Sequence, residues 1–214
     1  EQWRIRKAVM ETLESYPDGR AVINGLIPML GDKSDAPFRN AAIELLTRLG
    51  KKALPAVLRA AGSDDPYVRK LCVDILGQIA EPTAEKAIID ALTDPNENAR
   101  LAAAEALGNF NSNNSYQALL KLLHGADLTL KFCAMESLAQ IGREIPLNLI
   151  LPLVNQQILR RAVFDALGAS SEKEATRILV DGLKDSSPSA RNAAIRSLGR
   201  IYSKQRKLRG AIKE

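Results

Sequence analysis

The stretch Ala99–Phe110, ARLAAAEALGNF, decides the fold, because a related pattern returns along the chain about every 31 residues. Each copy runs apolar, basic, two spacers, then small or apolar, and reaches a leucine eight residues after its first apolar residue. Six further copies begin at Ile5, Phe38, Val68, Leu130, Leu159 and Ala190. A fixed period of this size predicts a stack of structural repeats.

The residues of each copy sort onto two faces of an α-helix. We number each copy from 0 at its first apolar residue and advance by about 100° per residue. Positions 0, 3, 4, 7, 8 and 11 then gather on one side and are nearly all apolar, which indicates a buried stripe. Positions 2, 6 and 10 point away from that stripe.

A second, shorter helix is expected between successive copies, at about 20–30, 53–61, 83–92, 116–123, 147–154 and 173–183. Asp65-Pro66 and Asp94-Pro95 read as a capping acceptor followed by the proline favoured at a helix start. The pattern predicts an all-α fold, an α-solenoid of stacked antiparallel helix pairs over residues 1–202. It would hold about seven repeats, the first one partial and represented by a helix at 2–16, and residues 203–214 would form a basic C-terminal tail.

Composition narrows the function. The chain has a formal charge of +5, of which the last twelve residues carry +4, so the basic character belongs to the tail. Aromatic residues make up 4%, which removes most of the stacking platforms that single-stranded nucleic acids need. Cys72 and Cys133 fall on inward positions two repeats apart, roughly 20 Å, too far for a disulfide. We expect both to be core thiols.

The sequence favours the cytoplasm. No apolar run reaches the ~20 residues of a membrane span, and no signal-peptide pattern opens the chain. The chain starts on what looks like the second helix of a repeat, so we expect it to be a piece of a longer protein.

Three segments carry a family resemblance: DPYVRKLCVDILGQI at 65–79, DPNENARLAAAEALGNF at 94–110 and SPSARNAAIRSLGRI at 187–201. They resemble HEAT repeats of the short bacterial type first noted in phycobilisome lyases. The resemblance covers almost the whole chain and implies the fold. It leaves the function open, because such proteins include scaffolds, adaptors, lyase subunits and HEAT-like DNA glycosylases.

Position 1 of the repeat is basic throughout. A row of phosphate-binding arginines is one interpretation. The resemblance instead implies that aspartates in the turns and these arginines interlock successive repeats. The residues of this structural ladder are Arg39, Arg69, Arg100 and Arg191 with Asp64, Asp94 and Asp185. Arg160 lacks a preceding turn aspartate, so we expect it to be free for another ligand or solvated.

Position 6 is acidic in most repeats, at Glu44, Asp74, Glu105, Glu136 and Asp165. In solenoids of this kind the second helices line the concave groove, so these acids predict a negative stripe that argues against nucleic acid. The alternative is that they are ordinary consensus residues, solvated or paired with Lys70 or Arg161 four residues earlier.

Position 2 is polar except at Leu101 and Phe132, in the two central repeats. We expect these two side chains to lie side by side as an exposed apolar centre. A polar rim would surround them, which is the anatomy of a protein-binding hot spot. The rim residues are Glu105, Glu136, Asn109 and Gln140, with Asp74 and Glu44 farther along. The alternatives are that Phe132 folds under a loop, or that both are isolated exposed residues.

The C-terminal end carries the main basic patch, formed by Arg196, Arg200, Lys204, Arg206, Lys207 and Arg209. It fits an acidic partner, an anionic membrane surface or nucleic acid. The alternative is a solvated cap of the solenoid.

No phosphate loop, dinucleotide fingerprint, HExxH or nucleophile elbow occurs, and the single histidine, His124, cannot form a zinc site with two distant cysteines. We therefore expect no catalytic residues, metal or cofactor. The leading hypothesis is a non-catalytic interaction domain whose groove binds a basic or amphipathic protein segment. The alternatives are a subunit of a chromophore lyase, or nucleic-acid binding through the basic end.

Overall fold

The computed structural model describes residues 11–12, 15–16 and 19–211, with side chains as far as Lys204. Within these ranges every regular element is a helix and no strand occurs. The all-α class is therefore confirmed. The helix expected at 2–16 lies largely outside the described residues, as do the side chains of Arg206, Lys207 and Arg209.

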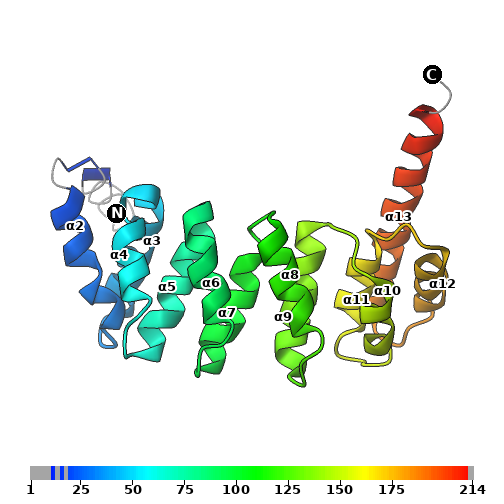
Figure 1. Cartoon of the computed structure of the whole chain (residues 1–214), viewed down its shortest axis with the longest axis horizontal. Helices are drawn as coiled ribbons and strands as arrows, with labels where there is room; N and C mark the ends of the chain where they lie inside the picture. The colour runs from blue at the N-terminus through cyan, green and yellow to red at the C-terminus, as the bar shows by residue number, and fades with distance from the viewer. Residues whose placement is uncertain (1–10, 13–14, 17–18, 212–214) are drawn as a thin grey trace. The chain divides into compact units, whose positions relative to one another are not determined.

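The chain divides into two compact units, and the first ends at Phe110. Each of its second helices packs against the next one, α3 on α5 and α5 on α7 (Figure 1). Those second helices are α3 (Ala36–Leu49), α5 (Pro66–Ile79) and α7 (Glu97–Leu107). The first helices are α2 (Gly19–Leu26), α4 (Leu54–Ala60) and α6 (Glu85–Ala91). Short 3-10 turns flank them at η1 (Pro28–Gly31), η2 (Gly50–Lys52) and η3 (Pro82–Ala84).

The second unit begins at Asn111 and repeats this arrangement. Its second helices also pack in sequence, α9 on α11 and α11 on α13 (Figure 1). They are α9 (Leu128–Ile141), α11 (Arg160–Leu167) and α13 (Pro188–Ala211). The first helices are α8 (Asn113–Leu122), α10 (Leu147–Ile150), extended by the 3-10 turn η4 (Leu151–Leu153), and α12 (Lys173–Gly182). Helix α13 continues without a break to Ala211, through most of the basic tail.

Prolines shorten two of the expected first helices. The helix expected at 20–30 ends at Leu26, and a 3-10 turn begins at Pro28. The helix expected at 147–154 ends at Ile150, and a 3-10 turn containing Pro152 follows. Proline has no N–H and its ring crowds the preceding turn, so the α-helical hydrogen bonds cannot continue.

Helix starts follow the predicted chemistry in one case and depart from it in another. Asp65 caps α5 by accepting the N–H of Tyr67 at 2.8 Å, as expected. Before α7 the cap is Asn96, which accepts the N–H of Ala99 at 3.2 Å, so the expected cap at Asp94 was wrong. The Asp94 carboxylate instead accepts the N–H of Asn96 at 2.8 Å and holds an arginine of the preceding repeat.

The recurring leucine at position 8 forms the centre of the core. It is fully buried in the internal repeats, at Leu46, Leu76, Leu107, Leu138 and Leu167. In the last repeat Leu198 is half-buried. The core thus depends on each second helix being covered by its neighbours.

Small residues let successive second helices approach closely. A Cβ added at Gly77, position 9 of α5, would lie 2.5 Å from the Cβ of Ala106, position 7 of α7. In the second unit a Cβ at Gly168, position 9 of α11, would lie 2.7 Å from the Oγ of Ser197, position 7 of α13. The same pair of positions therefore forms the closest packing point in both units.

Both cysteines are buried and unpaired. Burial raises the pKa of the Cys72 thiol to about 12, because the thiolate would lose its hydration inside the core. We expect neither thiol to react with a disulfide reagent such as DTNB at mildly alkaline pH until the protein is unfolded. Rapid labelling of the folded chain would contradict the burial of the two thiols.

Candidate functional site

An arginine–aspartate pair links two repeats of the first unit. Arg69 on α5 donates to the Asp94 carboxylate through Nε at 2.7 Å and Nη2 at 2.9 Å. The side chains are 17% and 9% exposed, so this two-pronged contact is largely shielded from water. The Arg69 guanidinium holds the pKa of Asp94 below its usual range. Nη1 of Arg69 also donates to the carbonyl of Ser63 at 2.9 Å, in the turn before α5.

The second unit contains the same pair at the same spacing of 25 residues. Arg160 on α11 donates to Asp185 at 2.6 Å. Arg160 was expected to lack a partner, and that expectation was wrong. The partner is the aspartate of the turn that follows, not the turn that precedes.

The other ladder arginines donate to backbone carbonyls of their own turns. Arg100 donates to the carbonyl of Asp94 at 3.0 Å, and Arg191 donates to that of Asp185 at 2.6 Å. Arg39 donates to the carbonyl of Asp32 at 2.7 Å, and its guanidinium lies 5.3 Å from the ring centre of Tyr67. Asp64 contributes its own carbonyl, which accepts from Arg69 at 3.1 Å. These arginines are used inside the fold.

The first candidate face consists of positions 2, 6 and 10 on α3, α5 and α7. Leu101 is half-buried there, and Glu44 and Glu105 are exposed. Asp74 is half-buried and accepts a hydrogen bond of 2.6 Å from Lys70 four residues earlier, which is the local pairing considered as an alternative. The rim residue Asn109 donates through Nδ2 to the carbonyl of Gly77 at 3.0 Å, so it also ties α7 to α5.

The second candidate face consists of the same positions on α9, α11 and α13. Phe132 is half-buried, and the Arg161 guanidinium lies 5.4 Å from its ring centre, within cation–π distance. Arg161 also forms an ion pair with Glu136. Phe132 is therefore partly covered by an arginine of the next helix. Gln140 lies exposed near the end of α9. Leu101 and Phe132 belong to different units, and each is described within its own.

Arginines neutralise the carboxylates of this second face. Asp165 lies 3.9 Å from Arg161, 3.1 Å from Arg196 and 3.3 Å from Arg200. Glu136 has Arg161 as its partner. The negative stripe expected here is therefore an alternation of charges. Three arginines meet two carboxylates, a surplus of one positive charge.

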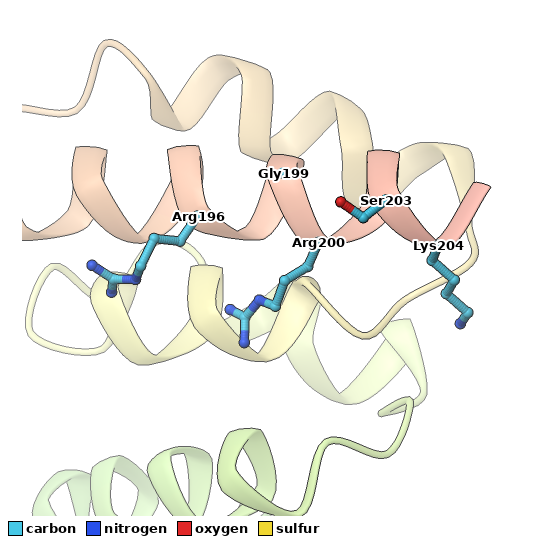
Figure 2. Close-up of a pocket in the computed structure, with 5 residues that line it drawn as sticks. All are labelled: Arg196, Gly199, Arg200, Ser203 and Lys204. Carbon is cyan, nitrogen blue, oxygen red and sulfur yellow. The ribbon is translucent and has the colours of Figure 1, made fainter. Parts of the chain in front are cut away.

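The basic patch continues along α13. Arg196, Arg200 and Lys204 extend on the same side of the helix, as Figure 2 shows. They line a groove of about 730 Å³ together with Gly199 and Ser203. Lys204 donates to the carbonyl of Ala169 at 3.3 Å and to the hydroxyl of Ser171 at 3.1 Å.

Over the described ranges, no three metal-binding side chains come together as a cluster. In the same ranges, no helix is both long enough and apolar enough to span a bilayer.

Comparison with protein families identifies the repeat. A model of HEAT repeats matches residues 23–94, 53–139, 85–157 and 153–211, which together reach from 23 to 211. The chain therefore belongs to the HEAT-repeat family. Among curated proteins, no relative matches the chain.

Solved structures share this fold at low sequence identity. The phycocyanin lyase complex of CpcE and CpcF from Nostoc sp. PCC7120 matches 68% of this chain at 22% identity, with a TM-score of 0.62. The karyopherin Kap121p bound to the extreme C-terminus of the protein phosphatase Cdc14p matches 86% at 20% identity, with a TM-score of 0.65. The S. pombe condensin Cnd3–Cnd2 subcomplex matches 89% at 18% identity, with a TM-score of 0.61.

This chain spans only part of each of those proteins. The match covers 63% of the lyase chain, 23% of the karyopherin and 32% of the condensin chain. At these identities the likeness establishes the fold alone.

Proposed function

We propose that this chain is a non-catalytic interaction domain that binds a segment of a partner protein on the exposed faces of its second helices. One observation carries the proposal. An apolar side chain at position 2 lies one helical turn before a carboxylate at position 6, in Leu101 and Glu105 of α7 and again in Phe132 and Glu136 of α9. All four residues are half-buried or exposed.

This arrangement has the chemistry of a binding surface. Covering a half-exposed apolar side chain contributes about 25 cal/mol for each Å² removed from water. The surrounding charges then orient the bound segment more than they strengthen its binding. A standard interface takes roughly 800 Å² from each partner, an area that three adjacent second helices can supply.

The two faces fit different segments. The first face has carboxylates at Glu44, Asp74 and Glu105, and Lys70 already pairs with Asp74. It therefore suits a basic or amphipathic segment, as the sequence predicts. The second face has charges of both signs, so a partner with mixed charges suits it better.

Structural neighbours support an interaction role by analogy. The matched karyopherin holds the C-terminus of a phosphatase, and the matched condensin chain lies in a complex of two subunits. Both use the HEAT-type fold to contact another protein. The analogy concerns the fold and does not name the partner of this chain.

Aspartate substitutions test the faces one at a time. We expect Leu101→Asp and Phe132→Asp each to weaken capture of a given partner at least tenfold (about 1.4 kcal/mol), because a charge replaces the apolar contact. Helicity and the urea midpoint should stay near those of the native chain. Val180→Asp is the matched control, because Val180 is an exposed apolar residue on the first helix α12. If helicity collapses in the Asp variants, those residues are core and the site is wrong.

A subunit of a chromophore lyase is the second candidate, because one matched structure is a phycocyanin lyase complex. Mixing the chain with a free bilin tests it. A shift of the bilin absorbance would support the lyase role, whereas an unchanged spectrum at saturating protein would favour the interaction domain.

A further inference from the structure

The last second helix, α13, exposes a face that its equivalents bury. In α5 and α11 position 5 is Val73 and Phe164, each only 3% exposed beneath the following helix. In α13 the same position is Ile195, which is 58% exposed. Tyr202, two turns farther along α13, is 68% exposed. This face has the apolar character of a helix-stacking surface.

Glycine occupies the packing point of that face. At Gly77 and Gly168 the missing side chain admits a small residue of the following helix. Gly199 holds the same position 9 on α13, and a Cβ built there meets no described atom within 4 Å. The backbone is therefore open to close approach by another helix at this point.

The charge on α13 is reversed relative to its equivalents. Position 6 is a carboxylate in the preceding second helices, and in the second unit it pairs with a cation of the next one, Glu136 with Arg161 and Asp165 with Arg196. On α13 that position is Arg196, followed by Arg200 one turn later. They line the groove beside Gly199 (Figure 2). A helix lying here needs carboxylates to complement them.

We propose that the end face of α13, formed by Ile195, Arg196, Gly199, Arg200 and Tyr202, docks an acidic amphipathic helix of a partner protein. An alanine or serine of that helix lies over Gly199, as Ala106 lies over Gly77. Its carboxylates face Arg196 and Arg200, and its apolar residues cover Ile195 and Tyr202. This surface contains neither Leu101 nor Phe132, so it is separate from the proposed function and does not depend on it.

Two other occupants fit the face less well. A second copy of α13 would bring the same arginines and meet like-charge repulsion. Nucleic acid would find Asp165 within the cluster of arginines and would leave Ile195 and Tyr202 in water. Charge and apolar character together favour an acidic helix.

A designed peptide tests the proposal on the full chain. The probe is a stapled, fluorescein-labelled helix of about five turns, with glutamates along one edge, leucines on the stacking side and a central alanine. Its binding is followed by fluorescence anisotropy. We expect Gly199→Ala to weaken binding about tenfold or more, because the added methyl group takes the space of the peptide's alanine. Unfolding of the Gly199→Ala chain should need no less urea than the native chain, which separates lost docking from lost folding.

A charge exchange provides the matched arm. Arg196→Glu should weaken binding of the glutamate peptide and strengthen binding of the same peptide carrying lysines. The proposal is overturned if the native chain does not bind the glutamate peptide, or if Gly199→Ala binds it equally well. A short DNA duplex that binds this end and is insensitive to Gly199→Ala would overturn it in favour of nucleic acid. Self-association that Gly199→Ala abolishes would overturn it in favour of a second copy.

Discussion

Replacing Gly77 with alanine should destabilise the chain by about 2 kcal/mol, although alanine is the better helix former. The added Cβ would lie 2.5 Å from the Cβ and 3.0 Å from the Cα of Ala106. The Cα is backbone, so no change of side-chain rotamer relieves the overlap, and α5 and α7 must separate. Strain from such overpacking typically costs about 1–3 kcal/mol or more, which exceeds the ~1 kcal/mol that alanine gains over glycine within a helix. Urea unfolding followed by circular dichroism measures the difference.

Gly199→Ala is the matched control for this prediction. It makes the same chemical change at the same repeat position, but the new methyl group meets no described atom within 4 Å. Only the helix-propensity gain remains, so stability should be unchanged or rise by up to ~1 kcal/mol. Equal effects of the two substitutions would show that close packing of the second helices does not hold the repeats together.

Asp94→Asn should destabilise the chain by about 2–3 kcal/mol at neutral pH, because Arg69 would keep its largely buried position without a carboxylate. Asparagine still offers an oxygen to the N–H of Asn96, so the turn itself is kept and the loss reports the ion pair. Asp90→Asn is the control, because Asp90 pairs with Lys86 on the exposed surface of α6. An exposed pair of that kind contributes at most about 0.5 kcal/mol.

The effect of Asp94→Asn should depend on pH in a defined direction. The pKa of Asp94 is lowered by its hydrogen bonds from Arg69, so the folded state favours the charged carboxylate. That contribution is fully present above the ordinary carboxyl pKa of about 4 and is lost as the pH falls through the lowered value. The difference between the native and Asp94→Asn chains should stay constant from about pH 5 to pH 8 and shrink below about pH 4. A difference that persists at acidic pH would contradict the ion pair.

The sequence was sufficient for the repeats because their signal is local. The spacing of apolar residues within a copy places Leu76, Leu107 and Leu138 on one side of a helix, and these leucines are fully buried. The prolines at 28 and 152 likewise mark where α-helix gives way to a 3-10 turn. Such features depend only on neighbours a few residues away.

The contacts between repeats were harder to predict. Arg160 finds Asp185 and Arg161 finds Glu136 across 25 residues, and only the stacking of helices brings them together. The same stacking places Arg161 against Phe132, which the sequence presented as an exposed apolar residue. A search for oppositely charged residues at a spacing of 25 would have indicated the two ladder pairs.

Site-specific photocrosslinking tests the central claim, that a partner binds on the second-helix faces, most directly. A photoreactive amino acid is placed at Leu101, at Phe132 and, as the control, at Val180 on α12, and the chain is irradiated in its native cell extract. The account predicts that the same partner is crosslinked through the positions of Leu101 or Phe132 and not through that of Val180. Crosslinks that form only through Val180, or equally through all three positions, would contradict it.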